Sequence, residues 1–353
     1  MEPLGRRQQS RRDPATLSLD ESFRPPRWLH NRHVQSILPS LPPRRRRLAR
    51  SLAPLLDASS ALLLDCGDGV RLQGFHAAPP RRAGAAQPPR IAMLLHGWEG
   101  SADSIYVLSL ARELFQRGFE VLRLNLRDHG ETHHLNRELF HSCRLPEVIG
   151  AVRYVQSLFP ETPLSLAGFS LGGNFMLRVA ARAGEAGLRI AKVVAISPVL
   201  DPAATLAALE SGFPAYHGYF VRKWVRSLAL KQAAWPQEYD LTELRRTGSV
   251  RAITTELVRR FTEFASLEEY LAGYAIVGPR LAGLAVPATL IMALDDPIIP
   301  ARDLERLAPS AALRVITTRR GGHCGFLERI GACTWAERKA AEELDSPSGP
   351  ASS

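Results

Sequence analysis

Short apolar runs recur along most of this chain, and segments with helix-like spacing separate them. Residues 91–95 are apolar at every position, which is typical of a strand covered on both faces. Strands that alternate with helices predict a mostly parallel, doubly wound sheet of the α/β class. The apolar runs predict strands at 62–65, 70–76, 91–95, 119–125, 164–167, 193–197, 288–293 and 313–317, and the spacing predicts helices at 104–116, 146–158, 171–183 and 302–307.

The alternation of strands and helices stops between residues 199 and 285. Helical patterns recur there, at 216–230 and 250–264, without a strand pattern between them. Such a segment is too long for a loop of a compact domain. We therefore expect a helical cap, inserted after a late strand, over the carboxyl ends of the strands, where sheets of this kind carry their chemistry. Several of its aromatic residues would either line a pocket or fill the core of the cap: Phe213, Tyr216, Tyr219, Phe220 and Trp224.

The two ends of the chain differ in composition from the rest. Residues 1–22 are polar and charged without periodicity, so we expect a disordered tail there, and another at 343–353. Residues 23–61 are expected to form an N-terminal arm and linker, whose proline-rich part would be extended and packed on the core. The α/β core would then comprise residues 62–198 and 286–342, on either side of the cap at 199–285.

Composition narrows the class of protein. With 353 residues, 45% of them hydrophobic and 23% charged, the chain reads as a soluble globular protein. No run of about 18 apolar residues predicts a transmembrane helix. Four cysteines are scattered without a C-x-x-C pair, so we expect neither a disulfide scaffold nor a zinc motif, and a reducing cytoplasm is the simplest location.

The net charge of +10 raises the question of a nucleic-acid or membrane partner. The basic residues are mostly Arg and are spread along the chain, so we expect no nucleic-acid partner. The one cluster, Arg44 to Arg47, is interpreted as a solvated run of charge, and peripheral contact with anionic lipid is kept as the alternative.

The candidate chemistry centres on Gly168-Phe169-Ser170-Leu171-Gly172, which fits the nucleophile-elbow pattern G-x-S-x-G between a strand and a helix. A serine on so sharp a turn takes a sparsely allowed backbone conformation, and its neighbours must be small because the strand and helix backbones pass close by. Ser170 is therefore the candidate nucleophile.

A serine hydroxyl needs a base, which in turn needs a carboxylate to orient it. His323 follows the predicted strand 313–317, and Asp295 and Asp296 follow the strand 288–293. Each would lie at the carboxyl end of its strand, within reach of Ser170. We favour Asp296 over Asp295 because the residue before a proline is forced into an extended conformation and can project from its loop, whereas Asp295 would cap the turn.

The oxyanion that develops during acyl transfer needs two backbone N–H donors. One is expected from Leu171, directly after the nucleophile, and the other from Trp98 in the loop after the strand 91–95. We interpret His96 as a structural residue of that loop and Cys324 as a small packed residue. His129, His133, His134 and His141 are interpreted as residues of a solvated loop, so no metal is expected.

These motifs in combination resemble the α/β-hydrolase superfamily, and within it the branch called YheT-like or AB hydrolase-4. The resemblance rests on His96-Gly97-Trp98-Glu99-Gly100-Ser101, on Gly168 to Asn174, on Asp295-Asp296-Pro297, on Gly322-His323-Cys324-Gly325-Phe326 and on the arm around Pro25 to Ile37. It implies hydrolysis of carboxylic esters, short-chain or acylglycerol-type, without a cofactor. Animal members of the branch carry an N-terminal membrane anchor, and we expect none here. The segment 125–134 departs from the Arg-Gly-x-Gly turn of many hydrolases, so substrate contacts in that loop are not implied.

The predicted partner is thus a small ester. The same residues leave two alternatives open. An acyltransferase would begin with the same acylation of Ser170, and a binding protein would keep the fold without the chemistry.

Overall fold

A computed structural model describes residues 16–80 and 89–347 of the chain. Within these described residues, nine strands form one sheet, in the order β1-β9-β8-β7-β6-β4-β5-β3-β2. The pairs β2–β3 and β3–β5, at one edge of the sheet, are antiparallel. The other pairs are parallel. The mostly parallel sheet predicted from the sequence is therefore confirmed. The strands are β1 (Thr16–Leu19), β2 (Ser59–Asp65), β3 (Arg71–Ala77), β4 (Ile91–Leu95), β5 (Glu120–Leu124), β6 (Leu164–Phe169), β7 (Ile190–Ile196), β8 (Ala288–Ala293) and β9 (Leu313–Thr318).

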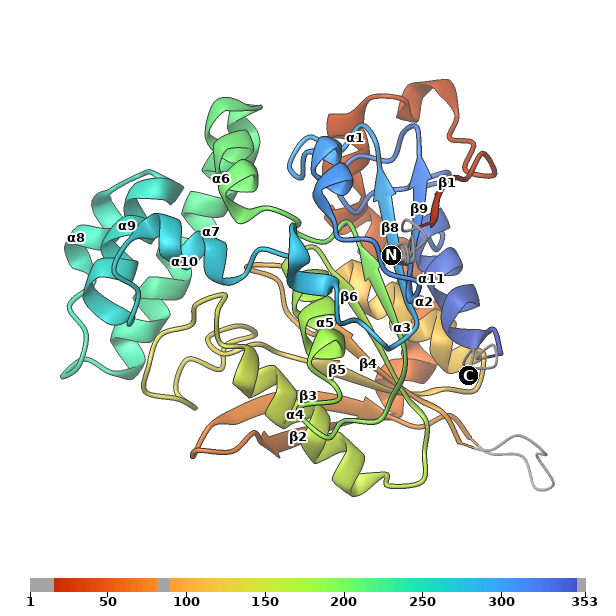
Figure 1. Ribbon diagram of the computed structural model, residues 1–353, viewed down its shortest axis with the longest axis horizontal. Helices are drawn as coiled ribbons and strands as arrows, with labels where there is room; N and C mark the ends of the chain where they lie inside the picture. The colour runs from red at the N-terminus through yellow and green to blue at the C-terminus, as the bar shows by residue number, and fades with distance from the viewer. Residues whose placement is uncertain (1–15, 81–88, 348–353) are drawn as a thin grey trace, which may run out of the picture.

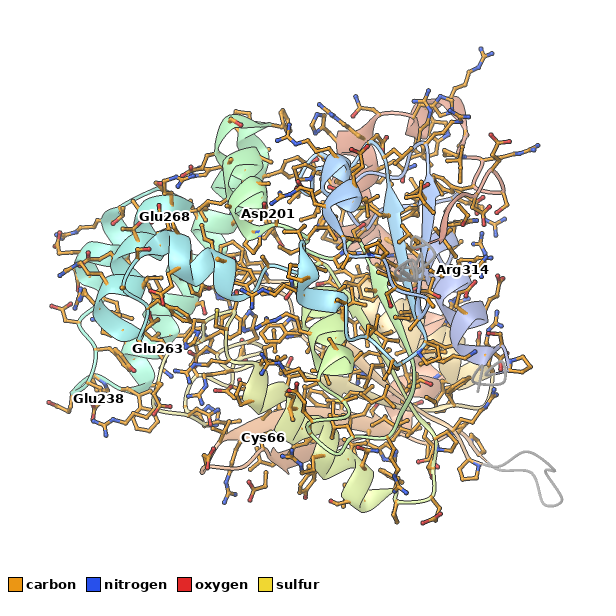
Figure 2. The ribbon with its side chains drawn as sticks, viewed as in Figure 1. Cys66, Asp201, Glu238, Glu263, Glu268 and Arg314 are labelled. Atoms are coloured by element: carbon orange, nitrogen blue, oxygen red, sulfur yellow. The ribbon has the colours of Figure 1, made fainter. Side chains whose placement is uncertain are left out.

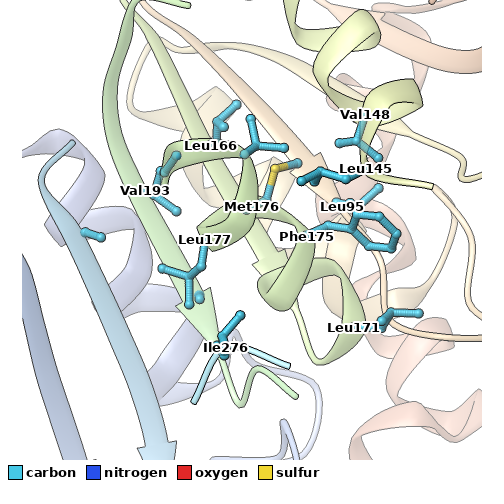
Figure 3. Packing of buried hydrophobic residues seen from close by; sticks show 14 of the residues in the cluster. Leu95, Leu145, Val148, Leu166, Leu171, Phe175, Met176, Leu177, Val193 and Ile276 are labelled. Atoms are coloured by element: carbon cyan, nitrogen blue, oxygen red, sulfur yellow. The ribbon is translucent and has the colours of Figure 1, made fainter. Parts of the chain in front are cut away.

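Helices cover both faces of the sheet, as a doubly wound fold requires (Figure 1). One face packs against α4 (Leu145–Leu158) and α5 (Leu171–Ala181), and the other against α2 (Pro42–Asp57), α3 (Ile105–Gln116) and α11 (Trp335–Asp345). Figure 3 shows Phe175 and Met176 of α5 on the side of Leu95 and Leu166, and Leu177 on the side of Val193 of β7. This packing fixes the helix that follows Ser170.

The segment between β7 and β8 forms the expected helical cap, which extends to one side of the sheet (Figure 1). It has a small hydrophobic core of its own, in which Leu228, Ile253 and Leu257 are buried. Its outer surface carries exposed charges, among them Glu238 and Glu268 (Figure 2). The segment contains α6 (Pro202–Ser211), α7 (Pro214–Ala234), α8 (Thr242–Arg246), α9 (Val250–Phe261), α10 (Leu267–Gly273) and η3 (Pro279–Leu281), and η4 (Ala301–Arg306) follows β8.

The N-terminal part differs from the prediction in two ways. Residues 16–19, expected in a disordered tail, form β1 and pair in parallel with β9, so Leu17 lies opposite Val315. The proline-rich arm is helical rather than extended, with η1 (Arg27–Leu29), α1 (Arg32–Ile37) and η2 (Leu38–Ser40) before α2. Two prolines begin α2, where a missing N–H costs nothing. The other predicted tail residues, 1–15 and 348–353, lie outside the described residues.

The expectation that Arg44 to Arg47 form a solvated run is wrong for Arg44. Its side chain is 1% exposed and forms two hydrogen bonds with the Glu337 carboxylate, at 2.7 and 2.9 Å. Glu337 in turn completes a capping box with Thr334 at the start of α11. The carboxylate partner of Arg44 thus belongs to α11. This helix ends at Asp345, so the first residues of the disordered tail predicted at 343–353 are helical.

Candidate active site

Ser170 lies on the sharp turn between β6 and α5. Its backbone has φ 51° and ψ −119°, a strained conformation for a residue with a side chain. A Cβ atom on Gly168 would lie 2.4 Å from the carbonyl carbon of Gly172, and one on Gly172 would lie 2.4 Å from the His96 carbonyl oxygen. The pattern G-x-S-x-G therefore has the steric cause expected from the sequence.

The structure brings Ser170, His323 and Asp296 together in one hydrogen-bonded chain. His323 Nε2 is 3.0 Å from Ser170 Oγ, and His323 Nδ1 is 2.8 Å from Asp296 Oδ2. The second carboxylate oxygen of Asp296 accepts hydrogen bonds from the N–H groups of Ile298 and Ile299. These bonds fix the carboxylate in the orientation that meets the imidazole.

Asp295, the alternative carboxylate, does not contact the His323 ring among the described hydrogen bonds. Its Oδ1 accepts a hydrogen bond from the Gly322 N–H at 2.9 Å, which holds the loop before His323. The two neighbouring carboxylates therefore differ in what they bind. Asp296 meets the imidazole, whereas Asp295 supports the loop that carries it.

The charge state of His323 depends on two opposing effects. Burial disfavours the charged imidazolium, but the Asp296 carboxylate outweighs burial and raises the pKa of His323 well above its ordinary value of 6.5. A proton taken from Ser170 would therefore be held strongly by this imidazole.

The two candidate oxyanion donors, Trp98 and Leu171, both line the pocket that contains Ser170. Among the described residues the structure records no hydrogen-bond acceptor for the N–H of Trp98 or of Leu171. The Trp98 ring stacks on Phe220 of the cap, with 5.0 Å between ring centroids and 12° between planes. The loop that carries one candidate donor is thus anchored to the cap.

His96 supports this loop rather than the reacting groups. Its Nδ1 lies 2.7 Å from the Gly97 carbonyl oxygen, and its Nε2 accepts a hydrogen bond from the Leu126 N–H. Burial lowers the pKa of His96 well below its ordinary value, so the ring is neutral and can accept that bond. This structural role agrees with the interpretation of the sequence.

A mostly apolar pocket extends from Ser170 into the cap, with a volume of about 90 Å³. Each of the cap helices α6, α7, α9 and α10 contributes to its wall through Leu206, Trp224, Leu257 and Leu271. One water molecule requires about 10–15 Å³ of such a cavity, so the pocket is large enough for roughly six to nine waters. A short or medium apolar chain therefore fits beside the serine.

The N-terminal arm supports the site through contacts that local sequence pattern does not predict. The Ser36 hydroxyl of α1 accepts a hydrogen bond from the His323 N–H at 2.8 Å. Gln35, fully buried, donates to the Leu327 carbonyl and accepts from the Leu327 N–H. The composition predicted an arm packed on the core, and the resemblance to the YheT-like branch includes Gln35. Neither predicted contacts with the site, because these contacts join residues nearly 300 positions apart.

The histidine-rich segment after β5 is also different from the prediction. We expected a solvated loop; His134 is exposed as expected, but His129, His133 and His141 are only 4% to 6% exposed. The cap contributes to this burial, since His133 Nε2 lies 2.9 Å from Ser227 Oγ and the His141 ring packs near Phe264 and Tyr270. In the part of the chain that the structure describes, no group of three or more His, Cys, Asp or Glu side chains has the arrangement of a metal site.

Comparison with known proteins places this fold and site in a family. The model of the alpha/beta hydrolase fold matches residues 93–330, and the chain belongs to that family. The "Putative esterase YheT" of Escherichia coli K12 is 28% identical over 322 residues, which cover 89% of this chain and 90% of YheT.

Two animal proteins are more distant relatives. Phospholipase ABHD3 of Mus musculus is 24% identical over 70% of this chain, and monoacylglycerol lipase ABHD2 of Mus musculus is 26% identical over 50% of it. The chain covers 61% and 45% of these two proteins, less than two thirds of their length.

A solved structure supports the fold alone. The crystal structure of 2,6-dihydroxy-pseudo-oxynicotine hydrolase superimposes with a TM-score of 0.53 at 17% identity, over 85% of this chain and 71% of that one. Within residues 16–80 and 89–347, no helix has the length and apolar character needed to cross a membrane.

Proposed function

We propose that this chain hydrolyses carboxylic esters through an acyl-enzyme on Ser170. The observation that carries the proposal is the hydrogen-bonded chain from Asp296 through His323 to Ser170, at the end of an apolar pocket. Its relatives support the same class of reaction, because their names describe an esterase, a phospholipase and a monoacylglycerol lipase.

In the first half of the reaction, His323 accepts the Ser170 proton while Oγ attacks the ester carbonyl. The tetrahedral oxyanion accepts hydrogen bonds from the N–H groups of Trp98 and Leu171, which also lies at the positive end of α5. His323 then gives its proton to the leaving alkoxide, and the alcohol departs. Asp296 stabilises the imidazolium each time it forms.

In the second half, water takes the place of the departed alcohol. His323 removes a proton from this water, which attacks the acyl carbonyl, and the proton returns to Ser170 Oγ as the acid leaves. The acyl or alcohol part of the substrate lies in the pocket among the side chains of the cap. Burial of its apolar surface there provides binding energy of about 25 cal/mol per Å².

The test compares the hydrolysis of p-nitrophenyl butyrate by the wild-type protein and by Ser170→Ala. We expect the variant to lose roughly a thousandfold or more in kcat, while Ser165→Ala, which changes a buried serine of the same strand β6, retains activity. A fluorophosphonate should label the wild-type protein at Ser170. Equal turnover by the wild type and Ser170→Ala, or a folded protein that resists the label, would rule the proposal out.

We further propose that the protein works in the cytoplasm. All four cysteines are free, and a reducing compartment keeps them so. Localisation of a tagged full-length chain by cell fractionation tests this.

A further inference from the structure

The pocket wall contains a buried imidazole without a partner. His141 lines the pocket together with Ser170, and its side chain is 6% exposed. Its Nδ1 is fully enclosed and has no hydrogen-bond partner, and the structure records none for its Nε2 among the described residues. Neither ring nitrogen therefore has a partner among the described residues, and only Nδ1 is fully enclosed, which leaves Nε2 within reach of a molecule in the pocket.

The ring is not free to turn away, because the segment around it is held on several sides. The His141 ring lies at steep angles to the rings of Phe264 and Tyr270, 85° and 73°, with centroids 6.0 and 6.3 Å away. The next residue, Ser142, donates its N–H to the Tyr270 hydroxyl, and its carbonyl accepts a hydrogen bond from Arg178. The orientation of the imidazole is therefore set before any substrate enters.

Two threonines of the pocket wall already have hydrogen-bond partners within the protein. The Thr205 hydroxyl donates to the Asp201 carbonyl, and the Thr254 hydroxyl donates to the Val250 carbonyl. Both threonines thus present their methyl groups as additional apolar surface. The imidazole of His141 keeps its hydrogen-bonding capacity for an occupant of the pocket.

The charge of the ring restricts what that occupant can be. Burial, reinforced by nearby arginines, lowers the pKa of His141 to about 3, so the imidazole is neutral at physiological pH. A neutral imidazole carries one N–H donor and one acceptor. Because Nδ1 is enclosed, Nε2 is the nitrogen through which the ring meets an occupant. An uncharged oxygen suits such a group better than a carboxylate or an ammonium ion.

We propose that His141 forms a polar subsite within the apolar pocket, and that the preferred esters carry one uncharged oxygen function, such as a keto, ether or hydroxyl group, in the part that fills the pocket. This inference rests on the proposed ester hydrolysis and narrows its substrate class. His141 takes no part in bond making; it selects and orients the substrate through one hydrogen bond.

The test uses matched substrates that differ by one oxygen. p-Nitrophenyl hexanoate is compared with its 3-oxo, 4-oxo and 5-oxo analogues, and a second series places an ether oxygen in the alcohol part of butyrate esters. We expect wild-type kcat/KM for at least one oxygenated member to exceed that of its parent by about fivefold to tenfold, the size expected for one hydrogen bond between uncharged groups.

Two variants of His141 and one control variant test whether the preference for the oxygenated ester depends on the His141 imidazole. His141→Leu should abolish it, and His141→Gln, which retains a donor, should keep part of it. His133→Leu is the control, because His133 is also buried with an unpartnered Nδ1 but does not line the pocket, so it should keep the wild-type ratio. Thermal unfolding checks that each variant is folded.

The outcomes separate the two proposals. If the parent hexanoate is not hydrolysed in a Ser170-dependent manner, the proposed function fails. If it is hydrolysed but the wild-type protein prefers no oxygenated member of either series, the polar subsite is refuted and the ester hydrolase is not. A preference that survives unchanged in folded His141→Leu also overturns the assignment to this residue.

Discussion

The Ser36 hydroxyl accepts a hydrogen bond from the backbone N–H of His323 at 2.8 Å, although 287 positions separate the two residues. The same hydroxyl donates to the Arg32 carbonyl of its own helix, so its position is fixed. A Cβ atom on Gly322 would lie 2.6 Å from this hydroxyl and 2.5 Å from the Arg32 carbonyl oxygen. Helix α1 and the loop that carries the proposed base are therefore in close contact.

Ser36→Ala should lower kcat about fivefold and leave KM nearly unchanged, because the loss of one hydrogen bond lets the His323 loop relax without changing the pocket. Steady-state kinetics on p-nitrophenyl butyrate measure this split. Ser51→Ala is a matched control, since Ser51 also donates to its own helix and accepts from a neighbouring arginine, but it lies far along α2. An equal loss of kcat in both variants would mean that the effect is not specific to the loop.

The pH profile should reflect the raised pKa of His323. A general base must be neutral, so kcat/KM should be low at acid pH and should rise as the pH passes the pKa of His323, which lies above 6.5. Asp296→Asn removes the charge that raises this pKa, so the acid limb should move to lower pH while the maximal rate falls roughly 10⁴-fold. An acid limb that stays in place in Asp296→Asn would contradict this assignment.

The same pKa shift affects stability. Because His323 binds its proton more tightly in the folded than in the unfolded protein, its contribution to stability is fully present below the unfolded pKa of about 6.5. It disappears as pH rises through the raised folded pKa. Denaturant unfolding of the wild type and of His323→Gln across this range should converge at the alkaline end. If the difference in unfolding free energy between the two proteins grew with pH, the pKa of His323 would not be raised in the folded protein.

The turn around Ser170 should tolerate no added methyl group. Gly172→Ala places a Cβ atom 2.4 Å from the His96 carbonyl oxygen and 2.5 Å from that of Leu95, so backbone atoms must move. We expect a loss of at least about 2 kcal/mol in the free energy of unfolding, together with loss of activity. Gly184→Ala is the control, because nothing lies within 4 Å of a Cβ atom there. Equal stability of the two variants would argue against this close packing.

A buried ion pair joins the cap to the loop after β5. Lys231 Nζ lies 3.0 Å from Asp128 Oδ1, and both side chains are almost fully buried. Lys231→Met leaves the Asp128 carboxylate uncompensated, so unfolding free energy should fall by about 3–5 kcal/mol at pH 8. The double variant with Asp128→Asn should recover part of this loss.

This loss should depend on pH. Burial raises the pKa of Asp128 to about 6 even with Lys231 present, and it rises further when the lysine is removed. Asp128 then binds a proton more tightly in the folded than in the unfolded variant, so the penalty should shrink as pH falls from 8 to 5. Urea unfolding of the wild type and Lys231→Met at pH 8 and pH 5 measures this penalty. A penalty that is the same at both pH values would contradict its assignment to the uncompensated charge of Asp128.

The sequence predicts those features that local pattern determines. The continuous apolar run at 91–95 is β4 without an error at either end, and β8 also has its predicted bounds. Asp296 was preferred over Asp295 on the conformation imposed by the following proline, and Asp296 is the carboxylate that meets the imidazole. The close contact of Gly168 and Gly172 with neighbouring backbone atoms was likewise predicted from the G-x-S-x-G motif.

What the sequence does not predict depends on distant partners. Four residues at 16–19 lack the length and the apolar character of an obvious strand, and become one only because β9 offers an unpaired edge. Arg44 looked solvated because its carboxylate partner, Glu337, is 293 positions away. The burial of His129 and His133 likewise requires a cap that no local pattern positions over them.

The pairing of β1 with β9 has a consequence for synthesis of the protein. At about 5–20 residues per second, the roughly 300 residues between these elements take about 15–60 s to be translated. Throughout that interval the segment that forms β1 has no partner strand, and this part of the nascent chain is exposed to aggregation and to proteolysis.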